Sequence, residues 1–117
     1  MKIYFCREGL RIIREMLQRE LPNDEVLECA PARLAEVVGE ADVLIPTLTP
    51  IGASLLAGSK VRLVQQFGAG LDTVDIAAAT RLGIQVANVP AAGTDNAESV
   101  AEIAVLLMLA LARQFPA

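Results

Sequence analysis

Residues 66–113 read QFGAGLDTVDIAAATRLGIQVANVPAAGTDNAESVAEIAVLLMLALAR, and this stretch carries the clearest signal of the architecture. It combines a glycine-containing turn, a helix, a short apolar strand, a polar loop and an intensely apolar helix. After the turn, the pattern predicts a helix at Asp72–Leu82 and a strand at Ile84–Asn88. A loop follows at 89–95, and the last helix covers about 96–113. A strand between two helices is the repeating unit of α/β proteins with a parallel sheet.

The helix predicted over Asp72–Leu82 has both ends marked in the sequence. Asp72 can cap its start, and Asp75 stands three residues later, in the manner of a capping box. Arg81 suits the last turn, where a positive charge favours the helix dipole. Gly83 suits a left-handed exit from the helix.

The same alternation extends upstream to the start of the chain. Four further strands are predicted, at Lys2–Cys6, Glu25–Cys29, Asp42–Ile45 and Val61–Phe67. Helices are predicted between them, at Glu8–Glu20, Pro31–Val38 and Gly52–Ala57, the last closed by Gly58. Five strands that alternate with helices predict an α/β fold, with a flavodoxin-like parallel sheet of order 2-1-3-4-5 and helices on both faces. Ligands of such sheets bind beyond the carboxyl ends of the strands.

Composition excludes several classes of protein. A chain of 117 residues with 54% hydrophobic content predicts one domain with an aliphatic core. A net charge of −4 without a basic cluster argues against nucleic acid and anionic membranes as partners. The sequence contains neither a signal-peptide pattern nor an apolar run of about 18 residues, so we expect a cytoplasmic protein.

The chain contains no histidine, which removes the commonest general base and leaves poor material for a zinc site. No metal site is therefore expected. Cys6 and Cys29 are far apart in sequence and form no CxxC pair, so we expect two free, largely buried thiols.

Gly68-Ala69-Gly70 follows a predicted strand and precedes a predicted helix. Glycines at both flanks allow positive φ and a close approach of the backbone to a ligand, with N–H groups free to hold an anion. The turn lacks the third glycine of a dinucleotide fingerprint, and Asn88-Val89-Pro90 stands where that fingerprint has an acidic residue. A tight turn without a ligand remains the alternative.

Two features of the last helix bear on binding. Asn96 is a good helix cap, and its side-chain amide could instead reach a substrate carboxylate or carbonyl. The ten residues of Ile103–Ala112 are all apolar, so the helix needs cover on every side. We expect one face to lie on the sheet and the other to pack against another domain or a second subunit.

From about residue 43 onwards the sequence resembles the substrate-binding lobe of the D-isomer-specific 2-hydroxyacid dehydrogenases. FGAGLDTVDIAAATRLGIQVANVP is similar to the family's G-x-G-x-D-x-[IV]-D…G-[IV]-x-V-x-N-x-P run. NAESVAEIAVLLMLALAR is similar to its N-x-x-S-[VA]-A-E motif, which is followed by an apolar helix. The resemblance implies that residues 1–117 form one lobe, and that a Rossmann domain for NAD or NADP is expected after residue 117.

The resemblance also implies roles for particular residues. Backbone N–H groups at Ala69 and Gly70 are expected to hold the substrate carboxylate, and Asn96 to lie beside the substrate. Ala69 and Val100 are expected near the cofactor. The first loop, Pro46–Thr49, resembles the segment that closes over the substrate, so Leu48 and Thr49 are expected to contact it.

The family's catalytic Arg, Glu and His belong to the nucleotide lobe, so no catalytic residue is assigned in this chain, and the chain alone is expected to be inactive. The implied enzyme interconverts small 2-hydroxy and 2-oxo acids by hydride transfer. The expected partners are the missing domain and a second copy, as a homodimer or larger assembly. A stand-alone regulatory or interaction module with the same fold remains the alternative. A receiver domain is excluded because its paired acids and its lysine have no counterparts, and a flavodoxin because the phosphate loop is missing.

Overall fold

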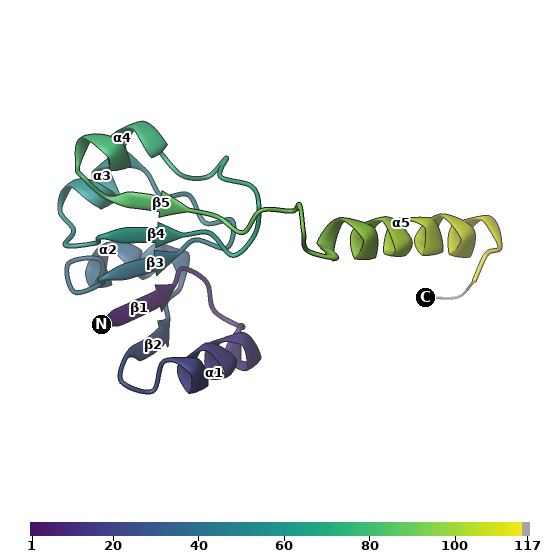
Figure 1. The fold of residues 1–117 in the computed structure, drawn as a ribbon, viewed down its shortest axis with the longest axis horizontal. Helices are drawn as coiled ribbons and strands as arrows, with labels where there is room; N and C mark the ends of the chain where they lie inside the picture. Colours follow the sequence, from purple (N-terminus) through teal and green to yellow (C-terminus); the bar gives the residue numbers. More distant parts are fainter. Residues whose placement is uncertain (116–117) are drawn as a thin grey trace.

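The computed structural model describes residues 1–115, so the last two residues of the predicted lobe lie outside the described part. Five strands form one parallel sheet in the order β2-β1-β3-β4-β5 (Figure 1). The strands are β1 (Lys2–Phe5), β2 (Glu25–Glu28), β3 (Val43–Ile45), β4 (Leu63–Gln65) and β5 (Gln85–Ala87). The predicted flavodoxin-like order is confirmed.

The connections contain five α-helices and a 3₁₀ turn. These are α1 (Arg11–Glu20), η1 (Pro31–Arg33), α2 (Leu34–Val37), α3 (Ala53–Ala57), α4 (Ile76–Arg81) and α5 (Asn96–Ala112). Three of the four crossovers join strands that are adjacent in the sheet, and the crossover from β2 passes β1 to reach β3.

The side chains of β1 alternate between two hydrophobic clusters, one on each face of the sheet. Ile3 and Phe5 pack with apolar side chains of α1 and its flanking residues. Tyr4 belongs to the larger cluster on the opposite face, which includes Leu34 of α2, Leu56 of α3 and Ala79 of α4. Helices therefore cover both faces, as predicted.

The first two predicted helices differ from those in the structure. The helix expected from Glu8 begins at Arg11, because Gly9 has a φ of +87° and its N–H donates to the Glu28 carboxylate instead of joining a helical turn. The helix expected over Pro31–Val38 is divided into η1 and the short α2.

The helix predicted from Asp72 begins at Ile76, and its cap is Asp75 rather than Asp72. The Asp75 carboxylate accepts a hydrogen bond from the N–H of Ala78 at 2.8 Å. The preceding residues cannot be helical because they pair with Ile51: its N–H donates to the carbonyl of Thr73 and its carbonyl accepts from Asp75. The predicted left-handed exit is confirmed at Gly83, whose φ is +71°.

Helix α5 lies apart from the sheet, and the expectation that one of its faces would lie on the sheet is wrong. The segment after β5 continues past the carboxyl edge of the sheet instead of turning back over it, and α5 extends along the long axis of the molecule (Figure 1). None of its residues is buried. Asn96 is the first helical residue rather than the cap, and Asp95 stands at the cap position without a side-chain hydrogen bond.

Cys6 and Cys29 are free and buried, as predicted. Burial raises the pKa of the Cys6 thiol to about 12 and also raises the pKa of Cys29. No helix within residues 1–115 is both long enough and apolar enough to span a bilayer.

Candidate functional site

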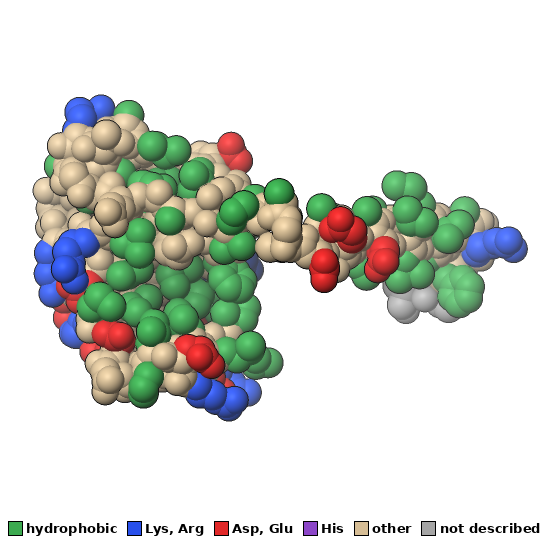
Figure 2. Space-filling view, in the orientation of Figure 1, with side chains coloured by type: hydrophobic (Ala, Val, Ile, Leu, Met, Phe, Trp, Pro, Cys, Tyr) green, Lys and Arg blue, Asp and Glu red, His purple; other side chains and the backbone are tan. Residues whose placement is uncertain are grey.

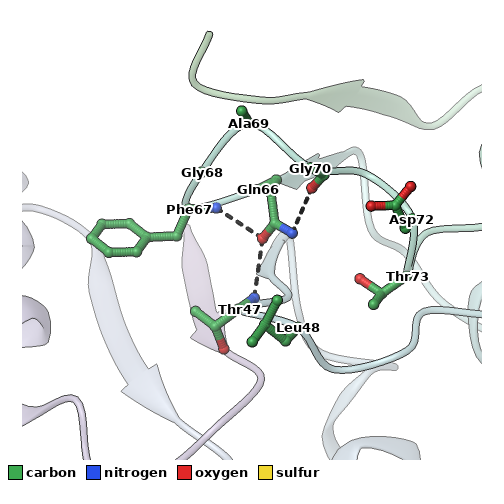
Figure 3. A pocket seen from close by; sticks show the side chains of 9 residues that line it. All are labelled: Thr47, Leu48, Gln66, Phe67, Gly68, Ala69, Gly70, Asp72 and Thr73. Carbon is green, nitrogen blue, oxygen red and sulfur yellow. Dashed lines mark hydrogen bonds between the residues drawn. The ribbon is translucent and has the colours of Figure 1, made fainter. Parts of the chain in front are cut away.

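A hollow of about 410 Å³ opens where the chain leaves the carboxyl ends of β3 and β4 (Figure 3). Its size falls within the range of pockets that bind small molecules. It is lined by Thr47, Leu48, Gln66, Phe67, Gly68, Ala69, Gly70, Asp72 and Thr73. Two adjacent strands of a parallel sheet thus bring two loops together at the edge where ligands of such sheets bind.

The backbone at Gly68–Gly70, which we call the cradle, has its three carbonyl groups engaged by neighbouring segments. The Gly68 carbonyl accepts from the N–H of Val89 at 2.9 Å. The Ala69 carbonyl accepts from Asn88 Nδ2 at 2.7 Å, and the Gly70 carbonyl from Gln66 Nε2 at 2.8 Å. Within residues 1–115, the N–H groups of the cradle donate to no protein acceptor. Fixed carbonyls combined with free N–H groups are what an anion-binding loop requires.

The glycines of the cradle do not take the positive φ that the sequence allowed. Positive φ occurs at Gly9, Gly83 and Gly93, and at neither Gly68 nor Gly70. A Cβ atom at Gly68 would meet nothing within 4 Å, and one at Gly70 would lie 3.3 Å from Asp72 Oδ2. The glycines therefore keep the cradle open to a ligand rather than permit an unusual backbone.

Electrostatics in the hollow depend on backbone dipoles. Asp72 is the only charged residue among those that line it, and it is exposed to solvent. An anion in the hollow would therefore be held by neutral N–H donors, without a lysine or arginine of the lining. Among residues 1–115, no group of three or more candidate metal ligands is assembled.

The loop after β3 forms the opposite wall and has a constrained backbone. Thr47 and Leu48 have φ values of 50° and 86°, which non-glycine residues rarely adopt. Leu48 is 73% exposed, at the mouth of the hollow. Thr49 is buried instead, and its hydroxyl donates to the carbonyl of Cys6 at 2.6 Å.

A second hollow, of about 270 Å³, shares Phe67, Gly68 and Ala69 with the first. Asn96 lines it together with Ala69, which belongs to both hollows. The structure thus brings Leu48, Ala69 and Gly70 to the first hollow and Asn96 to the second. Thr49 and Val100 line neither, and Val100 is 62% exposed on α5.

Three polar residues at the site were not singled out from the sequence. Gln66 and Asn88 hold the cradle carbonyls, and the Oγ1 atom of Thr73 is buried beside the first hollow with no hydrogen-bond partner among the described residues. Two successive glutamines at the end of the apolar strand VRLVQQF are the signal that marks Gln66.

Comparison with known proteins gives one matching family model and several relatives. The family model described as "D-isomer specific 2-hydroxyacid dehydrogenase, catalytic domain" matches residues 3–112. D-3-phosphoglycerate dehydrogenase of Mycobacterium tuberculosis is 44% identical over 73% of this chain and 16% of its own length. Glyoxylate reductase of Thermococcus litoralis is 34% identical over 97% of this chain and 35% of its own length.

Solved structures match in the same way. The NAD-dependent formate dehydrogenase from Staphylococcus aureus, in complex with NAD, superposes with a TM-score of 0.75 and 26% identity, over 98% of this chain and 39% of that one. The NAD⁺-bound 3-phosphoglycerate dehydrogenase from Entamoeba histolytica gives a TM-score of 0.74 and 30% identity, over 94% and 38%. The chain therefore spans well under half the length of these relatives.

Proposed function

The chain belongs to the D-isomer-specific 2-hydroxyacid dehydrogenase family, and we propose that it is the substrate-binding part of an NAD(P)-dependent oxidoreductase acting on small 2-hydroxy and 2-oxo acids. The observation that carries the proposal is the cradle, where three carbonyls accept hydrogen bonds and three N–H groups have no acceptor among residues 1–115. A carboxylate is the anionic group that every such substrate shares, and oriented backbone donors can hold it without a side-chain charge.

In this proposal the chain binds and orients the acid. The N–H groups of Ala69 and Gly70 hold the carboxylate, and Leu48 shields the hollow from water at its mouth. Asn96, in the adjoining hollow, stands beside the rest of the substrate. Thr49 supports the loop from within, since its hydroxyl bonds to the carbonyl of Cys6.

The residues of this chain do not by themselves fit a nicotinamide dinucleotide. The turn at Gly68–Gly70 has no third glycine, and Val100, the second residue implied near a cofactor, lies on α5 outside both hollows. We therefore assign NAD or NADP mainly to a further domain, which would also supply the catalytic arginine, glutamate and histidine. The chain alone should then be catalytically silent.

Helix α5 supplies the contact surface for that domain and, in the isolated chain, for a second copy. Its large apolar residues are 54–80% exposed, and apolar side chains are visible along the face of α5 that Figure 2 shows. Acidic Glu98 and Glu102 lie near its start and basic Arg113 at its end, so two copies in antiparallel orientation would bring opposite charges together. Exposed apolar surface of this extent marks an interaction site. The exposed apolar surface of α5 also favours the alternative function, a stand-alone regulatory or interaction module.

Binding of glyoxylate to the ¹⁵N-labelled chain tests the proposal. We expect saturable amide shifts concentrated at Ala69 and Gly70, and no such shifts with uncharged glycolaldehyde at the same concentration. Shifts confined to surface lysines and arginines, or equal shifts with both probes, would contradict it. In a parallel assay, glyoxylate-dependent oxidation of NADH by the chain alone would refute its expected inactivity.

A further inference from the structure

Gln66 is a buried polar residue that joins the two loops of the first hollow (Figure 3). Its side chain is 5% exposed. Oε1 accepts hydrogen bonds from the N–H groups of Thr47 at 3.2 Å and of Phe67 at 3.0 Å, while Nε2 donates to the carbonyl of Gly70 at 2.8 Å. Both ends of the amide are engaged, so a flipped amide would face two donors with its own donor group.

We propose that Gln66 is a positioning residue for anion binding, which acts through the backbone of the cradle and of the loop after β3 rather than by contact with the ligand. The proposal rests on the proposed function. One amide group fixes the Gly70 carbonyl at the end of the cradle and the Thr47 N–H on the opposite wall. This side chain therefore links the two walls of the hollow directly, in addition to the backbone pairing of Ile51 with Thr73 and Asp75.

The backbone conformation of the loop after β3 explains why the hydrogen bond from Thr47 to Gln66 matters. Thr47 and Leu48 both have positive φ, and strained residues of this kind persist only where the surrounding structure holds them. The hydrogen bond from Thr47 to Gln66 is a direct hold on the first of them. When it is lost, the loop is free to relax, and Leu48 leaves its place at the mouth of the hollow.

Substitutions that separate the two functions of the amide test this role. Gln66→Met keeps the length of the side chain and removes all three hydrogen bonds. Gln66→Glu keeps the acceptor for Thr47 and Phe67, and it can donate to the Gly70 carbonyl only when the carboxyl is protonated. Gln65→Met is the matched control, because Gln65 is the last residue of β4, precedes Gln66 and lines neither hollow; it removes only the hydrogen bond of 3.1 Å from Gln65 Nε2 to the Gln66 carbonyl.

The readout is glyoxylate affinity, measured from the amide shifts of Ala69 and Gly70 at pH 8 and at pH 5.5. We expect Gln66→Met to weaken binding about tenfold at both pH values, in keeping with the loss of buried hydrogen bonds. Burial at position 66 should raise the pKa of the introduced carboxyl, so Gln66→Glu should bind weakly at pH 8 and recover in part at the lower pH, whereas Gln65→Met should match the wild type. The wild-type chain, measured at both pH values, is the reference for each variant.

Failure of this inference differs from failure of the proposed function. If the wild-type chain does not bind glyoxylate at the cradle, the proposed function fails. If it binds and folded Gln66→Met binds equally well, the role of Gln66 is refuted. Should Gln66→Met not fold, Gln66→Glu decides: the same loss of affinity relative to the wild type at both pH values, or no loss at either, overturns the proposal.

Discussion

The side-chain nitrogen of Asn88 lies 2.7 Å from the carbonyl oxygen of Ala69, and this bond fixes the direction of the Gly70 N–H. The carbonyl of Ala69 and the N–H of Gly70 belong to one planar peptide, and no peptide bond within residues 1–115 is cis. The two groups therefore point in opposite directions. A side chain on the strand end after β5 thus orients a donor proposed to bind the substrate.

Asn88→Asp should weaken glyoxylate binding roughly three- to tenfold, because a carboxylate cannot donate to the Ala69 carbonyl. The amide shift of Gly70 should change more than that of Ala69, whose N–H lies in the preceding peptide. Gln85→Glu is the control for added negative charge, since Gln85 is exposed on β5 and contacts neither hollow. Equal losses in both variants would attribute the effect to charge alone.

Gly70→Ala should separate binding from stability. Because the φ of Gly70 is not positive, alanine should change the free energy of unfolding by less than about 1 kcal/mol, while its methyl group narrows the cradle beside Asp72 and weakens glyoxylate binding. Gly83→Ala, at a φ of +71°, should do the reverse: it should destabilise the fold by about 1 kcal/mol or more and leave binding unchanged. Urea unfolding and amide shifts measure the two effects; a Gly70→Ala variant with unimpaired binding would exclude close approach at this glycine.

The order of the strands could be predicted because each buried strand is a short apolar run between clear helix signals, and because parallel crossovers leave few topologies. The first residue of α4 could not be predicted from the sequence. Asp72 and Asp75 are both good caps, and the choice between them is made by Ile51, which pairs with the backbone of Thr73–Asp75. That contact joins segments distant in sequence, so local signals do not contain it.

The residues of the site could be predicted from the sequence only where a local motif marks them. Ala69 and Gly70 follow from the local motif, and the structure places them in one hollow with Leu48. The role of Gln66 depends on side-chain hydrogen bonds to another loop, which no spacing rule reveals. The position of α5 was predicted wrongly because its apolar sequence records only that it needs cover, not where the cover comes from.

Self-association through α5 can be tested by exchanging charges. If two copies pair in antiparallel orientation, Arg113→Glu and Glu102→Arg should each weaken the dimer, and the double variant should restore most of the loss, since exposed ion pairs contribute up to about 1 kcal/mol each. Leu107→Lys, near the middle of the helix, should abolish pairing because it buries a charge in the apolar contact. Sedimentation or light scattering gives the dissociation constant. Additive losses in the double variant would rule out the antiparallel arrangement.

Stability should fall in acid because two carboxylates have lowered pKa values. The hydrogen bond from Lys2, and then that from Tyr4, lowers the pKa of Glu40, while the backbone N–H of Lys2 lowers the pKa of Asp42. A carboxyl whose pKa is lower in the folded chain than in the unfolded chain stabilises the fold at pH values above its ordinary pKa. This contribution is lost as the pH falls through the lowered pKa of the folded chain.

The free energy of unfolding should therefore decrease as the pH drops below 4.5, the ordinary value for glutamate. Glu40→Gln and Asp42→Asn should each reduce this dependence, whereas Glu20→Gln, at the exposed end of α1, should not. Urea unfolding at a series of pH values measures the slope. If the free energy of unfolding depends on pH equally in the wild type and in all three variants, neither carboxylate is responsible.

The segment that leads to α5 also holds the cradle, because Val89 and Asn88 donate to the carbonyls of Gly68 and Ala69. Any partner that shifts this segment when it engages α5 must shift those two bonds as well. By thermodynamic linkage, a partner that tightens the hold of the cradle on an acid is itself bound more tightly when the acid is present. With such a partner, binding at α5 and affinity for an acid at the sheet edge would be coupled.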